Sequence, residues 1–117
     1  KIAIVRQWRR VCHVEFIETP IFTKQITNLL DDAEYIQLQF TLAIQPNSGD
    51  VIRGGAGLRK IRWSAKGRGK RGGIRVIYYK IEEDQIFMLF AYPKNKQEDL
   101  TTEQLQTLRT LVAKELK

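Results

Sequence analysis

Residues 74–92 read IRVIYYKIEEDQIFMLFAY, and the expected fold is built around them. The first run, residues 74–81, is rich in β-branched and aromatic residues on both faces, which is typical of a central strand. The second run, residues 86–92, is equally apolar, and an acidic turn at residues 82–84 separates the two. Two apolar runs joined by a short polar turn predict an antiparallel β-hairpin.

Two further runs predict strands. Residues 14–17 alternate weakly and predict a short first strand, and residues 58–63, which glycines bound, predict another. Alternation along the latter places Lys60 and Arg62 on one face of the sheet and Arg59 on the other.

Two helices are predicted before these strands. Thr19 followed by Pro20 is a typical helix start, because threonine caps the first turn and proline is favoured at the first helical position. Asp31 and Glu34 have the spacing of a capping box and predict a second helix, which ends at residues 46–49. Since almost no loop separates them, the two helices are expected to form a helical hairpin.

A last helix behind Thr101 or Thr102 completes the scheme, with leucines at helical spacing. The expected order is β-α-α-β-β-β-α, which is an α+β architecture with an antiparallel sheet rather than a doubly wound one. At 117 residues the chain fits one domain. We assign this domain to residues 13–117. Residues 1–12 are an N-terminal extension that is compatible with an extra strand, a short helix, a flexible arm or a leader.

Positive charge is concentrated in residues 53–80. They hold ten of the 20 Lys and Arg residues, none of the 13 Asp and Glu residues, and seven of the eight glycines. A local basic surface of this kind typically binds polyanions, with nucleic acid as the first candidate. Aromatic faces beside basic groups can stack bases, which favours RNA with splayed nucleotides. The aromatic residues in question are Trp63, Tyr78, Tyr79, Phe90 and Tyr92.

Composition excludes several other classes of protein. The single cysteine, Cys12, rules out an internal disulfide and fits a reducing compartment, and one cysteine with one histidine cannot supply a structural zinc site. No apolar run approaches the roughly 18 residues that span a bilayer, so we expect a cytoplasmic protein without membrane contact. Ser64 and Arg71 occupy positions where a Walker loop requires glycine and serine or threonine. We expect no metal and no cofactor.

A conventional acid–base pair is not apparent. The acidic residues cluster at 31–34, 82–84 and 98–103, apart from the basic stretch, and are typical of helix caps and turn charges. The lone histidine, His13, is expected at the surface. Clustered cations could still support attack of a ribose 2′-OH on the adjacent phosphate, by stabilising the negative charge that develops. Composition alone favours RNA binding over RNA cleavage.

Four segments follow one another in the second half of the chain: GLRKIR at 57–62, KGRGKRGG at 66–73, RVIYY at 75–79 and YPKNKQEDL at 92–100. In this order they resemble the RelE/HigB family of toxins from bacterial type II toxin–antitoxin modules, and more narrowly its HigB-like branch. The resemblance extends from about Val14 to the C-terminus and leaves residues 1–12 outside.

The resemblance implies a small α+β fold, with two helices before a curved antiparallel sheet. It also implies an mRNA endonuclease that acts on the ribosome, contacting mRNA and rRNA, and inhibits translation. A cognate antitoxin, expected to carry a helix-turn-helix, would silence it, and any DNA contact would be made only through the antitoxin complex.

Carried over by motif, the basic catalytic positions of the family fall on Lys60, Arg62, Arg75 and Lys94. Arg75 is expected to clamp the scissile phosphate. The other candidates are expected to contact RNA: Arg59, Lys66, Arg68, Lys70, Arg71, Tyr79, Tyr92 and Lys96.

The chain departs from the family pattern at two points. Some members place a functional tyrosine downstream of the last strand, where this chain reads QEDL at 97–100, and others use a histidine near the site. Either Tyr79 or Tyr92 takes the stacking role, or cleavage is weak. The alternative function is a non-catalytic RNA- or ribosome-binding module, or an inactive toxin relative that acts with its antitoxin at DNA.

Overall fold

The computed structural model describes residues 8–64 and 73–115. In chain order, the elements are β1 (Trp8–Val11), β2 (Val14–Glu18), α1 (Pro20–Leu29), α2 (Asp32–Ile44), β3 (Asp50–Val51), β4 (Arg59–Trp63), β5 (Ile74–Glu82), β6 (Gln85–Pro93) and α3 (Thr102–Glu115). The predicted α+β class is confirmed, and the predicted order is present with two short strands, β1 and β3, added to it.

The strands form one sheet in the order β1-β2-β6-β5-β4-β3. The predicted hairpin of β5 and β6 lies at its centre. One pairing departs from the antiparallel expectation, because β2 runs parallel to β6. Parallel neighbours need a long crossover connection, and the chain between them supplies it through both N-terminal helices and three strands. The sheet is therefore mixed.

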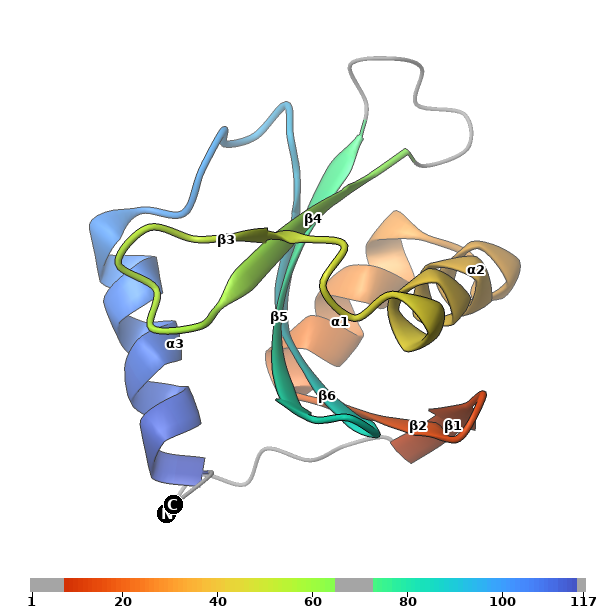
Figure 1. The fold of residues 1–117 in the computed structure, drawn as a ribbon. Helices are drawn as coiled ribbons and strands as arrows, with labels where there is room; N and C mark the ends of the chain where they lie inside the picture. The colour runs from red at the N-terminus through yellow and green to blue at the C-terminus, as the bar shows by residue number, and fades with distance from the viewer. Residues whose placement is uncertain (1–7, 65–72, 116–117) are drawn as a thin grey trace.

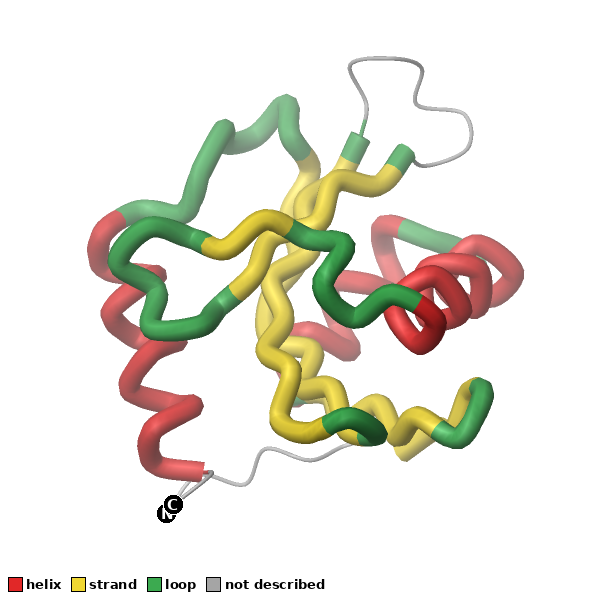
Figure 2. Tube along the Cα trace, viewed as in Figure 1, coloured by secondary structure: helices red, strands yellow, loops and turns green. Residues whose placement is uncertain are grey.

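Helices cover both faces of the sheet (Figure 1). The α1–α2 hairpin lies on one face and α3 lies on the other, so the strands form the middle layer of three (Figure 2). Each face has its own apolar core. The core beneath α1 and α2 includes Phe16, Phe22, Leu38, Leu42, Val76, Tyr78 and Met88. The core beneath α3 includes Leu58, Ile77, Phe87, Leu89, Leu108 and Val112.

Both predicted helix starts are present. The hydroxyl of Thr19 accepts a hydrogen bond from the backbone N–H of Phe22 at 3.0 Å, with Pro20 at the first helical position. Asp31 and Glu34 form the predicted capping box, in which each side chain accepts from the backbone N–H of the other. Local side-chain chemistry therefore fixes where α1 and α2 begin.

Residues 8–11 of the N-terminal extension form β1, which pairs antiparallel with β2. The turn between them is tight, with φ of +51° at Cys12 and +69° at His13. Both turn residues are exposed.

A β-bulge on β6 decides which side chains share the α3 face. Ile77 pairs with Phe90 and Tyr78 pairs with Met88, so Leu89 is an extra residue on β6. As a result Leu89 and Tyr92 lie in the same core, although they are three residues apart. With strict alternation, Tyr92 would point toward α1 and α2 instead.

In the part of the chain that the structure describes, no helix is both long enough and apolar enough to cross a membrane.

Candidate active site

Three basic side chains lie on the α3 face of the sheet. Arg62 on β4 pairs directly with Arg75 on β5, and Lys60 lies two residues earlier on β4, so all three share one side. Ile61 between them is buried in the core beneath α1 and α2. Strand alternation therefore brings together three of the four predicted catalytic residues.

Arg75 is the most enclosed of these cations, with only 7% of the residue exposed. Its Nη1 donates to the carbonyl oxygen of Ile74 at a long 3.4 Å. Within residues 8–64 and 73–115, no carboxylate forms an ion pair with it. Because a buried cation that forms no direct ion pair is costly, an external anion would stabilise this arrangement. The planar guanidinium suits a phosphate, which it can bind through two parallel hydrogen bonds.

Asp99, in the loop between β6 and α3, reaches the basic cluster. Its Oδ1 lies 2.6 Å from the Nζ of Lys60. The hydrogen bond from Lys60 and the charge of Lys60, with smaller contributions from Arg75 and Arg62, lower the pKa of the Asp99 carboxyl. The expectation that residues 98–103 lie apart from the basic stretch is therefore wrong for Asp99. The loop folds back over the sheet and joins residues that are 39 positions apart.

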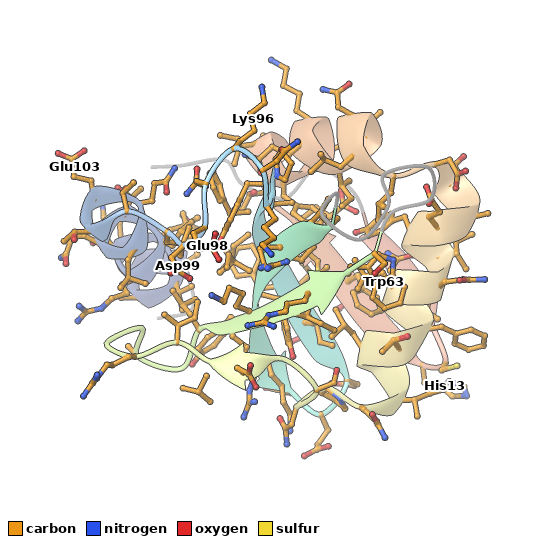
Figure 3. All side chains as sticks on the ribbon, turned by 90° about the horizontal axis from the view of Figure 1, so that it is seen from above. His13, Trp63, Lys96, Glu98, Asp99 and Glu103 are labelled. Atoms are coloured by element: carbon orange, nitrogen blue, oxygen red, sulfur yellow. The ribbon has the colours of Figure 1, made fainter. Side chains whose placement is uncertain are left out.

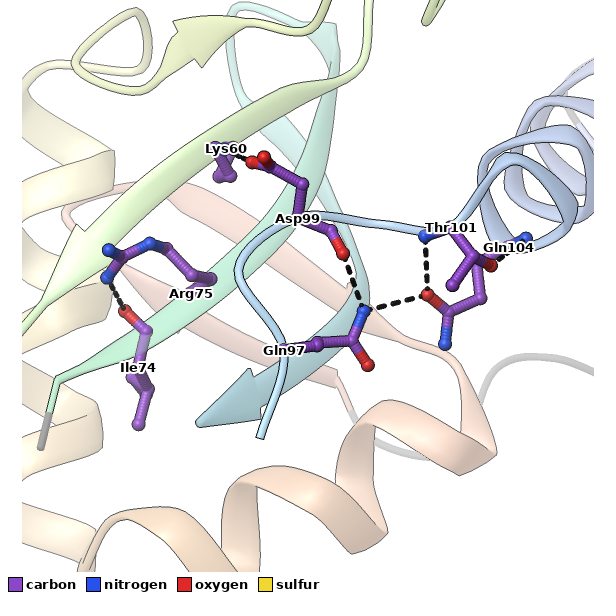
Figure 4. A network of polar contacts seen from close by, with 7 residues as sticks. All are labelled: Lys60, Ile74, Arg75, Gln97, Asp99, Thr101 and Gln104. Atoms are coloured by element: carbon purple, nitrogen blue, oxygen red, sulfur yellow. Dashed lines mark hydrogen bonds and ion pairs between the residues drawn. The ribbon is translucent and has the colours of Figure 1, made fainter. Parts of the chain in front are cut away.

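A hydrogen-bond network holds this loop against the start of α3 (Figure 4). Gln97 Nε2 donates to the carbonyl oxygen of Asp99 at 2.8 Å and to Gln104 Oε1 at 2.9 Å. Gln104 and Thr101 also cap the helix reciprocally, at 3.0 Å each way. The T-x-x-Q spacing of this cap is a usable sequence signal, because it places Asp99 two residues before the capping residue Thr101.

Tyr92 lies opposite Arg75 on β6, and only 3% of it is exposed. Burial, followed by the negative charge of Asp99, raises its pKa to about 12, although Arg75 opposes the shift. Its hydroxyl is buried and has no hydrogen-bond partner among the described residues. The enclosed ring offers no open face to a base. The hydroxyl is buried as well, so it would donate a hydrogen bond to a ligand only after the side chains around it move.

A cleft of about 370 Å³ opens beside this cluster. It lies between the β3–β4 region and the start of α3, and it combines charged groups with an apolar wall. Such a combination suits a nucleotide, because phosphate needs cations and a base needs apolar surface. Sequence reasoning identified only Lys60 and Arg62 among its residues. The full lining is Asp50, Val51, Ile52, Arg53, Lys60, Arg62, Asp99, Leu100 and Leu105.

The predicted lysines after β6 separate from one another. The backbone N–H of Lys94 donates to the carbonyl oxygen of Gly73 at 2.9 Å, which places Lys94 at the end of the sheet where β5 begins, near Arg75. Lys96 lines a different hollow, together with Gln25 on α1. Figure 3 shows Lys96 pointing away from Asp99.

Other predicted RNA contacts lie elsewhere. Arg59 is on the opposite face and donates to the carbonyl oxygens of Asn47 at 3.2 Å and Gly49 at 2.7 Å, which ties the chain after α2 to β4. Tyr79 is four residues beyond Arg75 on β5, roughly 13 Å along the strand. The remaining candidates fall outside the described residues: Lys66, Arg68, Lys70 and Arg71.

His13 lies far from Asp99 in Figure 3 and does not join the cluster. Among the described residues, no group of three or more His, Cys, Asp or Glu side chains could hold a metal ion. The described site brings together several cations, one carboxylate and one phenol.

A comparison with protein families adds to this geometry. Residues 22–117 match the family model described as "RelE toxin of RelE / RelB toxin-antitoxin system". The matched part runs from α1 through the whole of α3 and includes every residue of the cluster, whereas β1 and β2 precede it.

Proposed function

Because the chain belongs to the RelE toxin family of toxin–antitoxin systems, we propose that it is an endoribonuclease that cleaves mRNA on the ribosome and inhibits translation. The family also implies a cognate antitoxin. The observation that best supports cleavage is that Lys60, Arg62 and Arg75 share one face of the sheet with the buried hydroxyl of Tyr92, which has no hydrogen-bond partner within residues 8–64 and 73–115. We further propose that the chain belongs to the HigB-like branch and that it acts in the cytoplasm. Its antitoxin is expected to carry a helix-turn-helix.

In the proposed reaction, the scissile phosphate lies between Arg75 and Arg62. Arg75 binds two of its oxygens, and the Tyr92 hydroxyl donates to one of them. The ribose 2′-oxygen attacks phosphorus, the bond to the 5′-oxygen breaks, and the leaving 5′-oxygen takes up a proton from water. The products carry a 2′,3′-cyclic phosphate and a 5′-hydroxyl. Preorganised cations stabilise the extra negative charge on the phosphoryl oxygens in the transition state.

Asp99 gives this mechanism its proton acceptor. Its carboxylate neutralises Lys60 in the RNA-free protein. An arriving phosphate competes for the same ammonium group and releases the carboxylate beside the reacting ribose. The freed Asp99 then accepts the proton of the 2′-OH. Lys94, near the start of β5, is placed to contact the backbone of the same RNA.

The second candidate function is a non-catalytic RNA- or ribosome-binding module. The 2.6 Å ion pair favours it, because Lys60 lowers the pKa of the Asp99 carboxyl and so makes Asp99 a weaker acceptor for the 2′-OH proton, while Arg62 and Arg75 remain available to phosphate. Such a module would bind RNA with an affinity that falls steeply with salt, but it would leave the RNA intact.

Mapping of transcript ends after induction in cells tests the proposal. The wild-type chain should arrest growth and produce new 5′ ends within translated mRNAs, and Arg75→Ala should abolish both effects. Arg109→Ala, an exposed arginine on α3, is the matched control and should behave as wild type. Growth arrest with intact transcripts would favour the binding module, and an active Arg75→Ala variant would exclude the mechanism.

A further inference from the structure

Helix α2 exposes a row of large apolar side chains. Ile36, Phe40 and Ile44 are 42%, 48% and 67% exposed. They are three of the five large hydrophobic residues exposed in the described part of the chain. Single exposed hydrophobics are ordinary, but a contiguous group marks an interaction surface. We call these three residues the α2 ridge.

The fold does not need the α2 ridge. A different side of α2, which includes Leu38 and Leu42, fills the core against the sheet. The ridge residues recur every four positions, so they form one continuous row about 12 Å long. Rows with this spacing pack into the grooves between equivalent rows of another helix. The geometry therefore favours a helical occupant.

The charged residues around the α2 ridge limit the kinds of molecule that can bind there. Residues 25–52 contain no Lys, Arg or His, and they carry four carboxylates, at Asp31, Asp32, Glu34 and Asp50. The start of α2 beside the ridge is therefore acidic. It disfavours RNA and anionic lipid, and it favours an apolar segment flanked by Lys or Arg. A second copy of the chain would bring the same acidic helix and a formal net charge of +7.

We propose that the α2 ridge is the docking site for an amphipathic helix of the cognate antitoxin. Apolar side chains of that helix, three or four residues apart, pack along Ile36, Phe40 and Ile44, and its Lys or Arg residues lie near Asp32. Helix α2 lies on the opposite face of the sheet from α3 (Figure 1), and Arg75 is on the α3 face. The proposal rests on the antitoxin that the family implies and not on RNA cleavage, so the two proposals can fail separately.

The test uses the full chain and the antitoxin encoded by the neighbouring reading frame, with affinity measured by calorimetry. Phe40→Asp combined with Ile44→Asp should weaken binding at least about 100-fold, since it puts charges in place of two central apolar anchors. Gln37→Asp, which is exposed on the same helix but outside the row, is the matched control and should change affinity less than about threefold. Thermal unfolding and RNA affinity of the double variant should match wild type, which separates lost docking from lost folding.

A second arm tests the charge. Asp32→Lys should weaken antitoxin binding, and more so at low salt, because screening reduces the contribution of exposed charges. Three outcomes would overturn the proposal. In the first, the double variant binds the antitoxin as wild type does. In the second, Arg62→Glu abolishes binding while the ridge variant does not. In the third, the chain alone forms dimers that the ridge variant dissociates, which would identify a second copy as the occupant.

Discussion

Arg62 and Arg75 lie directly opposite each other on neighbouring strands. Like charges in this position repel and destabilise a sheet, so the pair is explained by a ligand and not by the fold. A phosphate between the two side chains would turn the repulsion into attraction. The single residues that define the site are thus costly in the free protein, which is common where stability has been exchanged for function.

Replacing Tyr92 by phenylalanine separates the effect of its hydroxyl on stability from its effect on RNA binding. The variant should be more stable by about 1 kcal/mol at neutral pH, because it removes a buried hydroxyl without a partner among the described residues. It should also bind single-stranded RNA less tightly, since phosphate loses a donor. Urea unfolding and fluorescence anisotropy measure the two effects, and a variant that is destabilised would contradict the assignment.

Alkaline pH gives an independent check on Tyr92. The folded state raises the pKa of its phenol from 10.0 to about 12. Between these values the folded protein keeps a proton that the unfolded chain releases. The free energy of unfolding of the wild type is therefore unaffected by this group below pH 10, and it falls as pH rises toward 12. The stability advantage of Tyr92→Phe over wild type should therefore grow from pH 10 upward. An advantage that stays constant would show that burial does not shift this group.

Asp99→Asn should have opposite effects on RNA binding and RNA cleavage. Without the carboxylate, Lys60 is free for phosphate, so affinity should rise by up to about fivefold. Cleavage should slow about 100-fold or more, because the acceptor for the 2′-OH proton is lost. Glu98→Gln, at the neighbouring exposed position, is the control and should change neither quantity. If Asp99→Asn cleaves as fast as wild type, Asp99 is only a competitor of RNA.

At the scale of elements, the turn between β3 and β4 packs against Tyr79 on β5. Gly57 lies in this turn with a φ of +101°, and a Cβ there would lie 2.9 Å from the ring of Tyr79. Gly54 has a similar φ of +71°, but open space surrounds the position of its Cβ. The two glycines share the backbone requirement, and only Gly57 adds a steric one.

Gly57→Ala should therefore destabilise the protein by about 2–3 kcal/mol, and Gly54→Ala by only about 1 kcal/mol. The difference reports the contact with Tyr79, because the backbone cost is common to both variants. Chemical denaturation of the two variants measures it. Equal losses would mean that the ring of Tyr79 moves aside without cost.

At the scale of the whole molecule, the cluster of Lys60, Arg62 and Arg75 lies on the α3 face of the sheet, and the acidic start of α2 lies on the other. RNA affinity should fall with salt, with a logarithmic slope of about −0.7 for each phosphate neutralised on a single strand. Arg62→Gln should reduce the steepness of this slope by about that amount. Lys24→Gln, an exposed lysine on α1, should leave it unchanged. Anisotropy titrations over a series of salt concentrations measure the slopes. Equal effects of the two variants on the slope would indicate that RNA binds through overall charge and not through the cluster.

Whether a contact can be predicted from the sequence depends on how far apart along the chain the two residues are. Helix starts at Thr19 and Asp31, and the shared face of Lys60 and Arg62, follow from side chains within four positions of one another, and they are confirmed. The pairing of Asp99 with Lys60 and the parallel pairing of β2 with β6 join distant segments. No local pattern encodes such contacts, because they depend on how loops return to the sheet.

The bulge at Leu89 makes the site depend on the parity of a short segment. Phe87 and Tyr92 share a face although an odd number of positions separates them. Losing one residue between them would remove the bulge and restore strict alternation with Tyr92 still on the α3 face, whereas losing two would turn Tyr92 toward α1 and α2. The segment can therefore lose the single bulge residue and keep the phenol opposite Arg75, whereas the loss of a second residue exchanges it for a neighbour of different chemistry.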